Sequence, residues 1–235
     1  MADFSTIVTE VERYAGRTDD IANIRKAVNA SIHRIESAAN WYWMEQVATV
    51  SLPAIAPMDR VSLPTTDPPG AFKDLREEPF YADGSGGRVD LEPISEEEAN
   101  VQYTDLDSGE PVAYRLWKDQ LYIYPPVRAT ARTMTLSYWK WSLDLTGTNA
   151  HELISRWPEL LVARACVEYM RANRDFKGAA YWEGDPRAPK PGTYMFELAM
   201  LKKYEARRKL PKALGARGDR FVRQRTSSGY PWWGR

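Results

Sequence analysis

The chain has 235 residues and is 43% hydrophobic, which is enough for one sizeable core or two modest ones. Its 32 basic and 32 acidic side chains balance, and this argues against a protein that coats nucleic acid over its whole surface. No apolar run approaches the roughly 20 residues of a membrane span, and the first residues lack the pattern of a signal peptide.

Charge is unevenly spread along this neutral chain. Residues 73–110 hold twelve acids and three bases, whereas residues 201–235 hold eleven bases and two acids. Such asymmetry favours contact between unlike regions or with an acidic partner. Cys166 is the only cysteine, so no disulfide can form within the chain, as expected for a reducing compartment.

Two helices are predicted at the start of the chain. Apolar residues at helical spacing predict a helix over residues 4–15, which Gly16 ends. A second apolar stripe predicts a helix from a cap at Thr18 or Asp19 to Ala39. Its predicted core positions are Ile21, Ile24, Val28, Ile32 and Ile35, and its other faces carry Arg25, Lys26, Arg34 and Glu36.

The hydrophobic period then changes from helix to strand. Residues 46–52 alternate as a strand does, and residues 53–70 contain five prolines, which predicts a long surface connection. The capping-box spacing of Ser95 and Glu98 predicts a short helix that ends near Tyr103.

The strongest strand patterns follow that short helix. Residues 111–117 and 121–124 are expected to pair as a hairpin, and residues 133–139 are expected to form a half-buried strand.

Helical patterns return near Asn149, a predicted cap. Pro158 is a good first helical residue, and the following stretch to Met170 is apolar on most faces, which predicts a buried helix. A short helix is expected over residues 175–183. A last helix is expected after Thr193, with Tyr194, Leu198 and Leu201 in one apolar line and basic residues towards its end.

These elements indicate an α+β fold. The outer helices are far apart in sequence and each has an apolar face, so we expect them to close into one bundle with a β insert projecting from it. The expected parts are a helical bundle formed by residues 1–41 and 147–209, a mostly β insert over residues 42–146, and an extended C-terminal arm over residues 210–235.

The residue types that build catalytic or metal sites are sparse. Two histidines and one cysteine are too few for an ordinary structural zinc site, and His33, His151 and Cys166 are each interpreted as structural. The acids of residues 92–98 fit either a cation site or, more simply, a solvated helix start. We therefore predict no catalytic residues, no metal and no cofactor.

The C-terminal arm has two interpretations, a solvated terminus or a segment that docks on a partner. The composition favours docking, because basic residues are followed by an aromatic end that would supply interface anchors. Fully extended, its last 24 residues would reach roughly 80 Å. The candidate docking residues are Arg217, Arg220, Phe221, Arg223, Arg225, Tyr230, Trp232 and Trp233.

The order of these parts resembles the head-to-tail adaptor (connector) proteins of short-tailed phages, including the tail-tubular-protein-A type. The resemblance covers Phe4 to about Arg208. The residues that carry it are Trp41-Tyr42-Trp43, Ser51-Leu52-Pro53, Pro93 to Glu98, Pro111 with Tyr114, Leu121 to Pro126, Tyr138 and Leu160-Leu161.

This resemblance implies a structural virion protein that is not an enzyme. Members form a ring, typically of twelve subunits, that joins the portal to the tail nozzle or hub and passes the genome through its bore during ejection. It implies assembly in the host cytoplasm, a place at the head-tail junction, an arm that reaches along the portal, transient contact with DNA in the channel and no membrane contact.

Two other functions were weighed against this one. A nucleic-acid-binding module would act through the basic C-terminal tail and lose affinity steeply with salt. A hydrolase would use a carboxylate pair from the acidic segment, although no spacing favours one pair.

Overall fold

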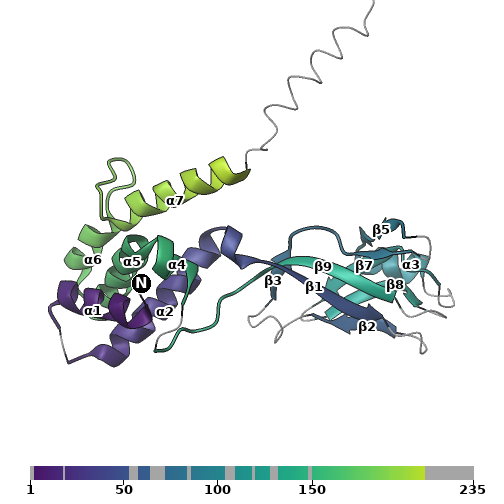
Figure 1. The fold of residues 1–235 in the computed structure, drawn as a ribbon, viewed down its shortest axis with the longest axis horizontal. Helices are drawn as coiled ribbons and strands as arrows, with labels where there is room; N and C mark the ends of the chain where they lie inside the picture. The colour runs from purple at the N-terminus through teal and green to yellow at the C-terminus, as the bar shows by residue number, and fades with distance from the viewer. Residues whose placement is uncertain are drawn as a thin grey trace, which may run out of the picture.

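The computed structural model describes residues 3–17, 19–52, 58–63, 72–83, 86–103, 109–117, 120–127, 132–147 and 150–209. It is elongated, with the helices of the chain ends packed together and the β-sheets at the opposite end (Figure 1). The fold is α+β, as the sequence predicts. Among the described residues, no helix has both the length and the apolar character that crossing a membrane requires.

The helices that form the bundle come from both ends of the sequence. They are α1 (Phe4–Ala15), α2 (Ile21–Ala38), α4 (Glu152–Arg156), α5 (Pro158–Ala172), α6 (Phe176–Glu183) and α7 (Tyr194–Lys209). Helix α5 is central and contacts α1, α2, α4, α6 and α7. Its apolar faces are buried against these neighbours, which confirms the prediction of a buried helix from Pro158 onwards.

The boundaries of the first two helices show which local predictions are correct. Helix α1 begins with a capping box between Asp3 and Thr6, and it ends at Gly16, whose φ of 64° suits a residue without a side chain. The predicted cap of α2 is wrong by one residue or more, because Asp20 occupies the N-cap position without a capping side-chain bond. Ile21 is 41% exposed, so the predicted stripe begins only at Ile24.

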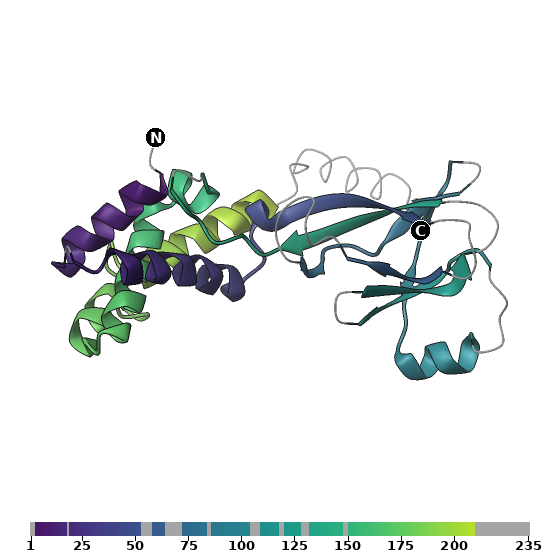
Figure 2. The same cartoon turned by 90° about the horizontal axis from the view of Figure 1, so that it is seen from below.

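Two β-sheets fill the other end of the molecule (Figure 2). The strands are β1 (Glu45–Leu52), β2 (Met58–Ser62), β3 (Phe72–Leu75), β4 (Phe80–Ala82), β5 (Arg88–Asp90), β6 (Glu92–Pro93), β7 (Ala113–Trp117), β8 (Gln120–Val127) and β9 (Arg132–Lys140). One sheet has the order β1-β9-β4-β5, with β3 also paired to β9, and the other has the order β2-β8-β7-β6.

Strands β1 and β9 form an antiparallel ladder that continues into the bundle connections. Glu45 lies opposite Trp139 and Leu52 opposite Arg132, with every residue between them paired. The predicted strands 46–52 and 133–139 and the hairpin of β7 with β8 are confirmed. The helix predicted after Ser95 is α3 (Glu96–Gln102), and its capping box is present.

Several expectations for the middle of the chain need correction. The proline-rich connection is not wholly irregular, because β2 forms within it and pairs with β8. Short strands β3, β4 and β5 were not predicted, since each has only three or four residues, and β3 and β4 also depend on the distant β9 for pairing. Asn149, the predicted cap before α4, lies outside the described residues, and His151 occupies the N-cap position instead.

The described residues form two separate hydrophobic cores. The bundle core contains 25 buried residues from α1, α2, α4, α5 and α7 and from the segments that enter and leave the sheets. The sheet core contains 11, including Leu52, Leu121 and Leu136. Each end of the molecule therefore has an interior of its own, and the link between them decides their relative orientation.

Candidate assembly site

The eight candidate docking residues of the C-terminal arm lie outside the described residues. The interpretation of residues 210–235 as an arm remains a prediction. The described chain stops at Lys209, the last residue of α7. The structure does show how the end of α7 is held and which surfaces the bundle offers.

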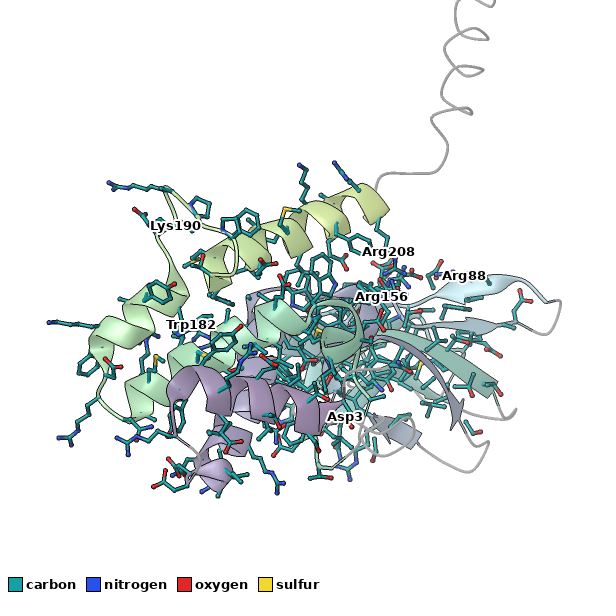
Figure 3. All side chains as sticks on the ribbon, turned by 60° about the vertical axis from the view of Figure 1, so that its left-hand side comes forward. Asp3, Arg88, Arg156, Trp182, Lys190 and Arg208 are labelled. Carbon is teal, nitrogen blue, oxygen red and sulfur yellow. The ribbon has the colours of Figure 1, made fainter. Side chains whose placement is uncertain are left out.

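The C-terminal end of α7 is fastened to the connection between α2 and β1. The Glu205 carboxylate, which is buried, accepts a hydrogen bond of 3.1 Å from the backbone N–H of Tyr42. The guanidinium of Arg208 lies 4.5 Å from the centre of the Tyr42 ring, and that of Arg156 lies 5.8 Å from it. Figure 3 shows these two arginines close together below the end of α7. The C-terminal end of α7 is thus anchored beside the start of the sheets.

The Tyr42 hydroxyl belongs to the same cluster. It donates a hydrogen bond of 2.5 Å to Oε1 of Glu152, which also pairs with Nε of Arg156 at 2.7 Å. Burial raises the pKa of the Tyr42 hydroxyl well above its usual range, and the bond to the Glu152 carboxylate raises it further. Tyr42 therefore acts as a neutral hydrogen-bond donor that ties α4 to the entrance of the sheets.

A buried carboxylate lies where the bundle meets the sheets. Glu36 of α2 is completely buried, and it accepts hydrogen bonds from Nε1 of Trp43 at 3.1 Å and from the backbone N–H of Ser142 at 3.0 Å. The Ser142 hydroxyl donates a third bond of 2.5 Å. Trp43 precedes β1 and Ser142 follows β9. The Glu36 side chain therefore bonds to both chain segments that cross between the bundle and the sheets. Lys73 and His151, whose contacts are given below, belong to the same cluster. We call the five residues Glu36, Trp43, Lys73, Ser142 and His151 the joint.

Lys73 completes the joint from β3. Its Nζ donates to the carbonyl oxygens of Glu36 and Ala39, at 2.5 and 3.0 Å, and lies 4.6 Å from the centre of the Trp141 ring. These carbonyls belong to the last turn of α2, where a cation is favoured by unpaired carbonyls and the helix dipole. Burial lowers the pKa of Lys73, and the charges of Glu36 and Asp74 oppose that shift.

The electrostatics of the joint favour a charged Glu36. Burial alone would raise the pKa of this carboxyl, but the nearby His151 side chain, with Nε2 at 3.6 Å, and hydrogen bonds from Ser142 and Trp43 outweigh burial and hold the pKa below its ordinary value. The sequence interpretation of Glu36 as a surface residue is therefore wrong. A signal was available, because Glu36 lies four residues after Ile32 and so falls on the buried stripe of α2.

Ser142, His151 and Glu36 have the residue types of a hydrolytic triad, but their proton arrangement differs. Nδ1 of His151 accepts the backbone N–H of Leu153 at 3.0 Å, which caps α4, so the ring proton is on Nε2. Nε2 lies 2.8 Å from Oγ of Ser142, whose own proton goes to Glu36. In this arrangement the imidazole donates to the serine and cannot remove its proton. The cluster is a structural network that fixes the joint.

The other residues with reactive side chains have structural surroundings. Cys166 is fully buried in α5, and burial raises the pKa of its thiol to about 12. Nε2 of His33 lies 2.9 Å from Asp144. Glu98 accepts the backbone N–H of Ser95 within the capping box, which agrees with the helix-start interpretation of residues 92–98. The described part of the chain contains no group of three or more His, Cys, Asp or Glu side chains that could hold a metal ion.

A groove of about 610 Å³ opens on the bundle at the end remote from the sheets. Its lining comes from α1, α5, α6 and the loop before α7. The lining residues are Thr6, Ile7, Glu10, Tyr14, Pro158, Glu159, Val162, Tyr181, Trp182, Pro191, Gly192 and Thr193. Sequence analysis did not single out this site, because its residues come from four separate segments and follow no local pattern.

Aromatic rings form one side of the groove. Trp182 packs partly into the bundle core, and its ring lies edge-on to Tyr14 at 4.8 Å between centroids and to Tyr181 at 5.7 Å. Tyr181 is 73% exposed, which is unusual for a large aromatic side chain. Figure 3 shows Trp182 and, on the loop between α6 and α7, Lys190. An exposed aromatic wall beside a groove is typical of a protein-binding surface.

Comparison with known proteins gives one family match. The family model described as SU10 adaptor protein matches residues 2–208. No curated protein matches the chain. A solved structure described as the neck of an empty GTA particle computed with C6 symmetry is similar at 12% identity, over 77% of this chain and 78% of that chain. Its TM-score is 0.23, and at that value the likeness carries no argument about this chain.

Proposed function

The chain belongs to the SU10 adaptor protein family, a family of phage head-to-tail adaptors, and we propose that it forms a ring, of twelve copies, between the portal and the tail. Membership of an adaptor family places the chain at the head-tail junction of a virion and indicates a structural, non-enzymatic protein. In the proposed ring, the copies line a channel for the genome and contact the DNA transiently as it leaves.

The observation that carries this proposal is the division of the molecule into two ends with separate cores. An adaptor must contact a different partner on each side. A subunit with a helical surface at one end and a β surface at the other meets that requirement, because each surface belongs to a part with its own core. The joint fixes the angle between the ends, so that twelve copies can present both surfaces in register.

We assign the bundle, residues 1–41 and 147–209, to the portal side and the insert, residues 42–146, to the tail nozzle or hub. Residues 210–235 serve as the arm that binds the portal or a neighbouring subunit through its arginines and aromatic residues. Residues 73–110 carry a net negative charge, which suits a surface that must release DNA and not retain it.

Electron microscopy of the full chain mixed with candidate portal rings tests this proposal. The expected result is a second ring stacked on the portal, with twelvefold symmetry in views along the axis. Separate particles at micromolar concentrations of both proteins would contradict it. A ring that is not coaxial with the portal would contradict it as well.

A variant of the arm makes the test more specific. Trp232→Ala with Trp233→Ala is expected to weaken portal binding at least tenfold while leaving the circular dichroism unchanged, because paired aromatic anchors commonly dominate an interface. Phe176→Ala, which removes an exposed aromatic side chain of α6, serves as the comparison. Unchanged portal binding by the tryptophan variant would remove the portal from the arm's partners.

A further inference from the structure

We propose that the groove between α1, α5 and α6 receives the aromatic C-terminal end of the arm from an adjacent copy of the chain in the ring. This inference rests on the proposed ring and names the partner of the arm within it. It concerns contact between copies, and it contributes to portal binding through the ring that this contact stabilises.

The shape and chemistry of the groove fit an aromatic anchor. A volume of about 610 Å³ is large enough for the side chains of a short aromatic segment. Tyr14, Tyr181 and Trp182 already form edge-on ring pairs along one wall. Aromatic residues associate preferentially in such offset or edge-on arrangements. The arm ends in Tyr230-Pro231-Trp232-Trp233, the densest aromatic sequence outside the described residues.

Charge is complementary between the two surfaces. The lining residues include two acids, Glu10 and Glu159, and no base. Glu10 is paired with Arg13 at 2.6 Å, so Glu159 supplies the uncompensated charge. Residues 210–235 hold six bases and a single acid. A basic segment with an aromatic end therefore matches a groove lined by aromatic rings and by the carboxylate of Glu159.

A buried carboxylate behind the groove wall strengthens the electrostatic argument. Glu197 of α7 is 8% exposed, and the hydrogen bond it accepts within the described residues comes from the backbone N–H of Gly192, at 3.2 Å. Burial raises the pKa of Glu197, the Gly192 bond partly offsets this, and the nearby charge of Glu159 adds to the rise. Two carboxylates that repel each other favour an incoming guanidinium.

The direction of α7 favours the arm of another copy. Gly192 and Thr193, which line the groove, lie immediately before α7, whereas the arm begins after Lys209 at the opposite end of the helix. A helix of 16 residues is about 24 Å long, so the arm starts about that far from its own groove. To reach that groove it would have to reverse and run back along α7. An adjacent copy in a ring can present its groove without such a reversal.

Binding of a labelled peptide to the full chain tests the groove. The probe is a peptide of residues 216–235, and its binding is followed by fluorescence anisotropy. We expect saturable binding that weakens as salt is raised, and at least tenfold weaker binding to Tyr181→Ala and to Glu159→Lys. The matched controls are Phe176→Ala, an exposed aromatic of α6 outside the groove, and Glu12→Lys, an acid of α1 outside the lining. Equal binding by groove and control variants would overturn the proposal.

A disulfide experiment decides which copy supplies the arm. One full-length chain carries Gly234→Cys beside the terminal tryptophans, and a second carries Lys190→Cys beside the groove. Native Cys166 is buried and does not compete. After mixing on portal rings and mild oxidation, we expect a disulfide between the two kinds of chain. A partner chain with Asn100→Cys on α3 should give little product.

The outcomes separate this inference from the proposed ring. If a chain with both cysteines forms an internal disulfide and the mixture forms none, the arm returns to its own groove and the inference is wrong. If the peptide binds isolated portal rings and not this protein, the arm serves the portal alone and the inference is wrong. In either case, twelvefold rings in the micrographs would leave the proposed function standing, whereas their absence would remove it.

Discussion

The bundle and the sheets differ in how the chain builds them. The bundle joins helices from both ends of the sequence around α5, and its core holds 25 buried residues against 11 in the sheets. The sheets include very short strands, namely β4 and β5 with three residues each and β6 with two, and one sheet depends on β9 for most of its pairings. The bundle is therefore expected to be the more stable frame, to which the sheets are attached by two chain crossings and the joint.

The largest expected effect is a contrast between matched core variants. Leu161→Ala in α5 and Leu121→Ala in β8 each replace a fully buried leucine, and each should lower the free energy of unfolding by about 2–5 kcal/mol. Leu161→Ala should reduce hydrogen-exchange protection at both ends of the molecule, because it weakens the frame. Leu121→Ala should reduce it mainly in the sheets. Equal loss of protection in the bundle from Leu121→Ala would show a single cooperative unit.

The second largest effect is expected from removing the Glu36 carboxylate of the joint. Glu36→Ala leaves the buried donors of Trp43 and Ser142 without an acceptor, and we expect a loss of about 3 kcal/mol in urea unfolding. Because both donors lie at the crossings, the tryptophan fluorescence of the chain, to which Trp43 contributes, should shift before the helix signal is lost. Glu12→Ala, on α1, is the control. A loss similar to that of the control would mean that the sheets are oriented without Glu36.

Part of the contribution of Glu36 to the free energy of unfolding depends on pH. The pKa of Glu36 in the folded protein lies below its value of 4.5 in the unfolded chain, so the charged form stabilises the fold above pH 4.5. That stability is lost as the pH falls through the folded pKa. The difference in unfolding free energy between the native chain and Glu36→Gln should therefore shrink as the pH falls below 4.5. A constant difference between pH 6 and pH 3 would contradict a charged Glu36.

The smallest expected effect concerns the lysine of the joint. Lys73→Met keeps the length of the side chain and removes two hydrogen bonds to the end of α2, and we expect a loss of about 1–2 kcal/mol. Lys26→Met, at an exposed position of α2, should change stability little. Comparable losses for both variants would indicate that Lys73 contributes nothing beyond its apolar contacts.

Much of the fold follows from local patterns. The helical stripes of α2, α5 and α7, the capping box of α3 and the alternation of β1 and β9 lie where periodicity places them. The short strands do not, because three or four residues carry too little pattern, and because β9, the partner of β3 and β4, is distant in sequence. The joint and the groove were missed for a related reason. Each assembles residues from several segments, and only the position of Glu36 on an apolar stripe gave a local sign.

The ladder between β1 and β9 also has a mechanical consequence. Both strands enter the ladder from the bundle at the same end, with Glu45 opposite Trp139. A pulling force between bundle and sheets is therefore shared by two covalent backbones that run side by side. No hydrogen bond of the ladder has to carry that tension, and the joint at its base keeps the two strands from being peeled apart. This construction suits a protein that joins two larger assemblies at the head-tail junction.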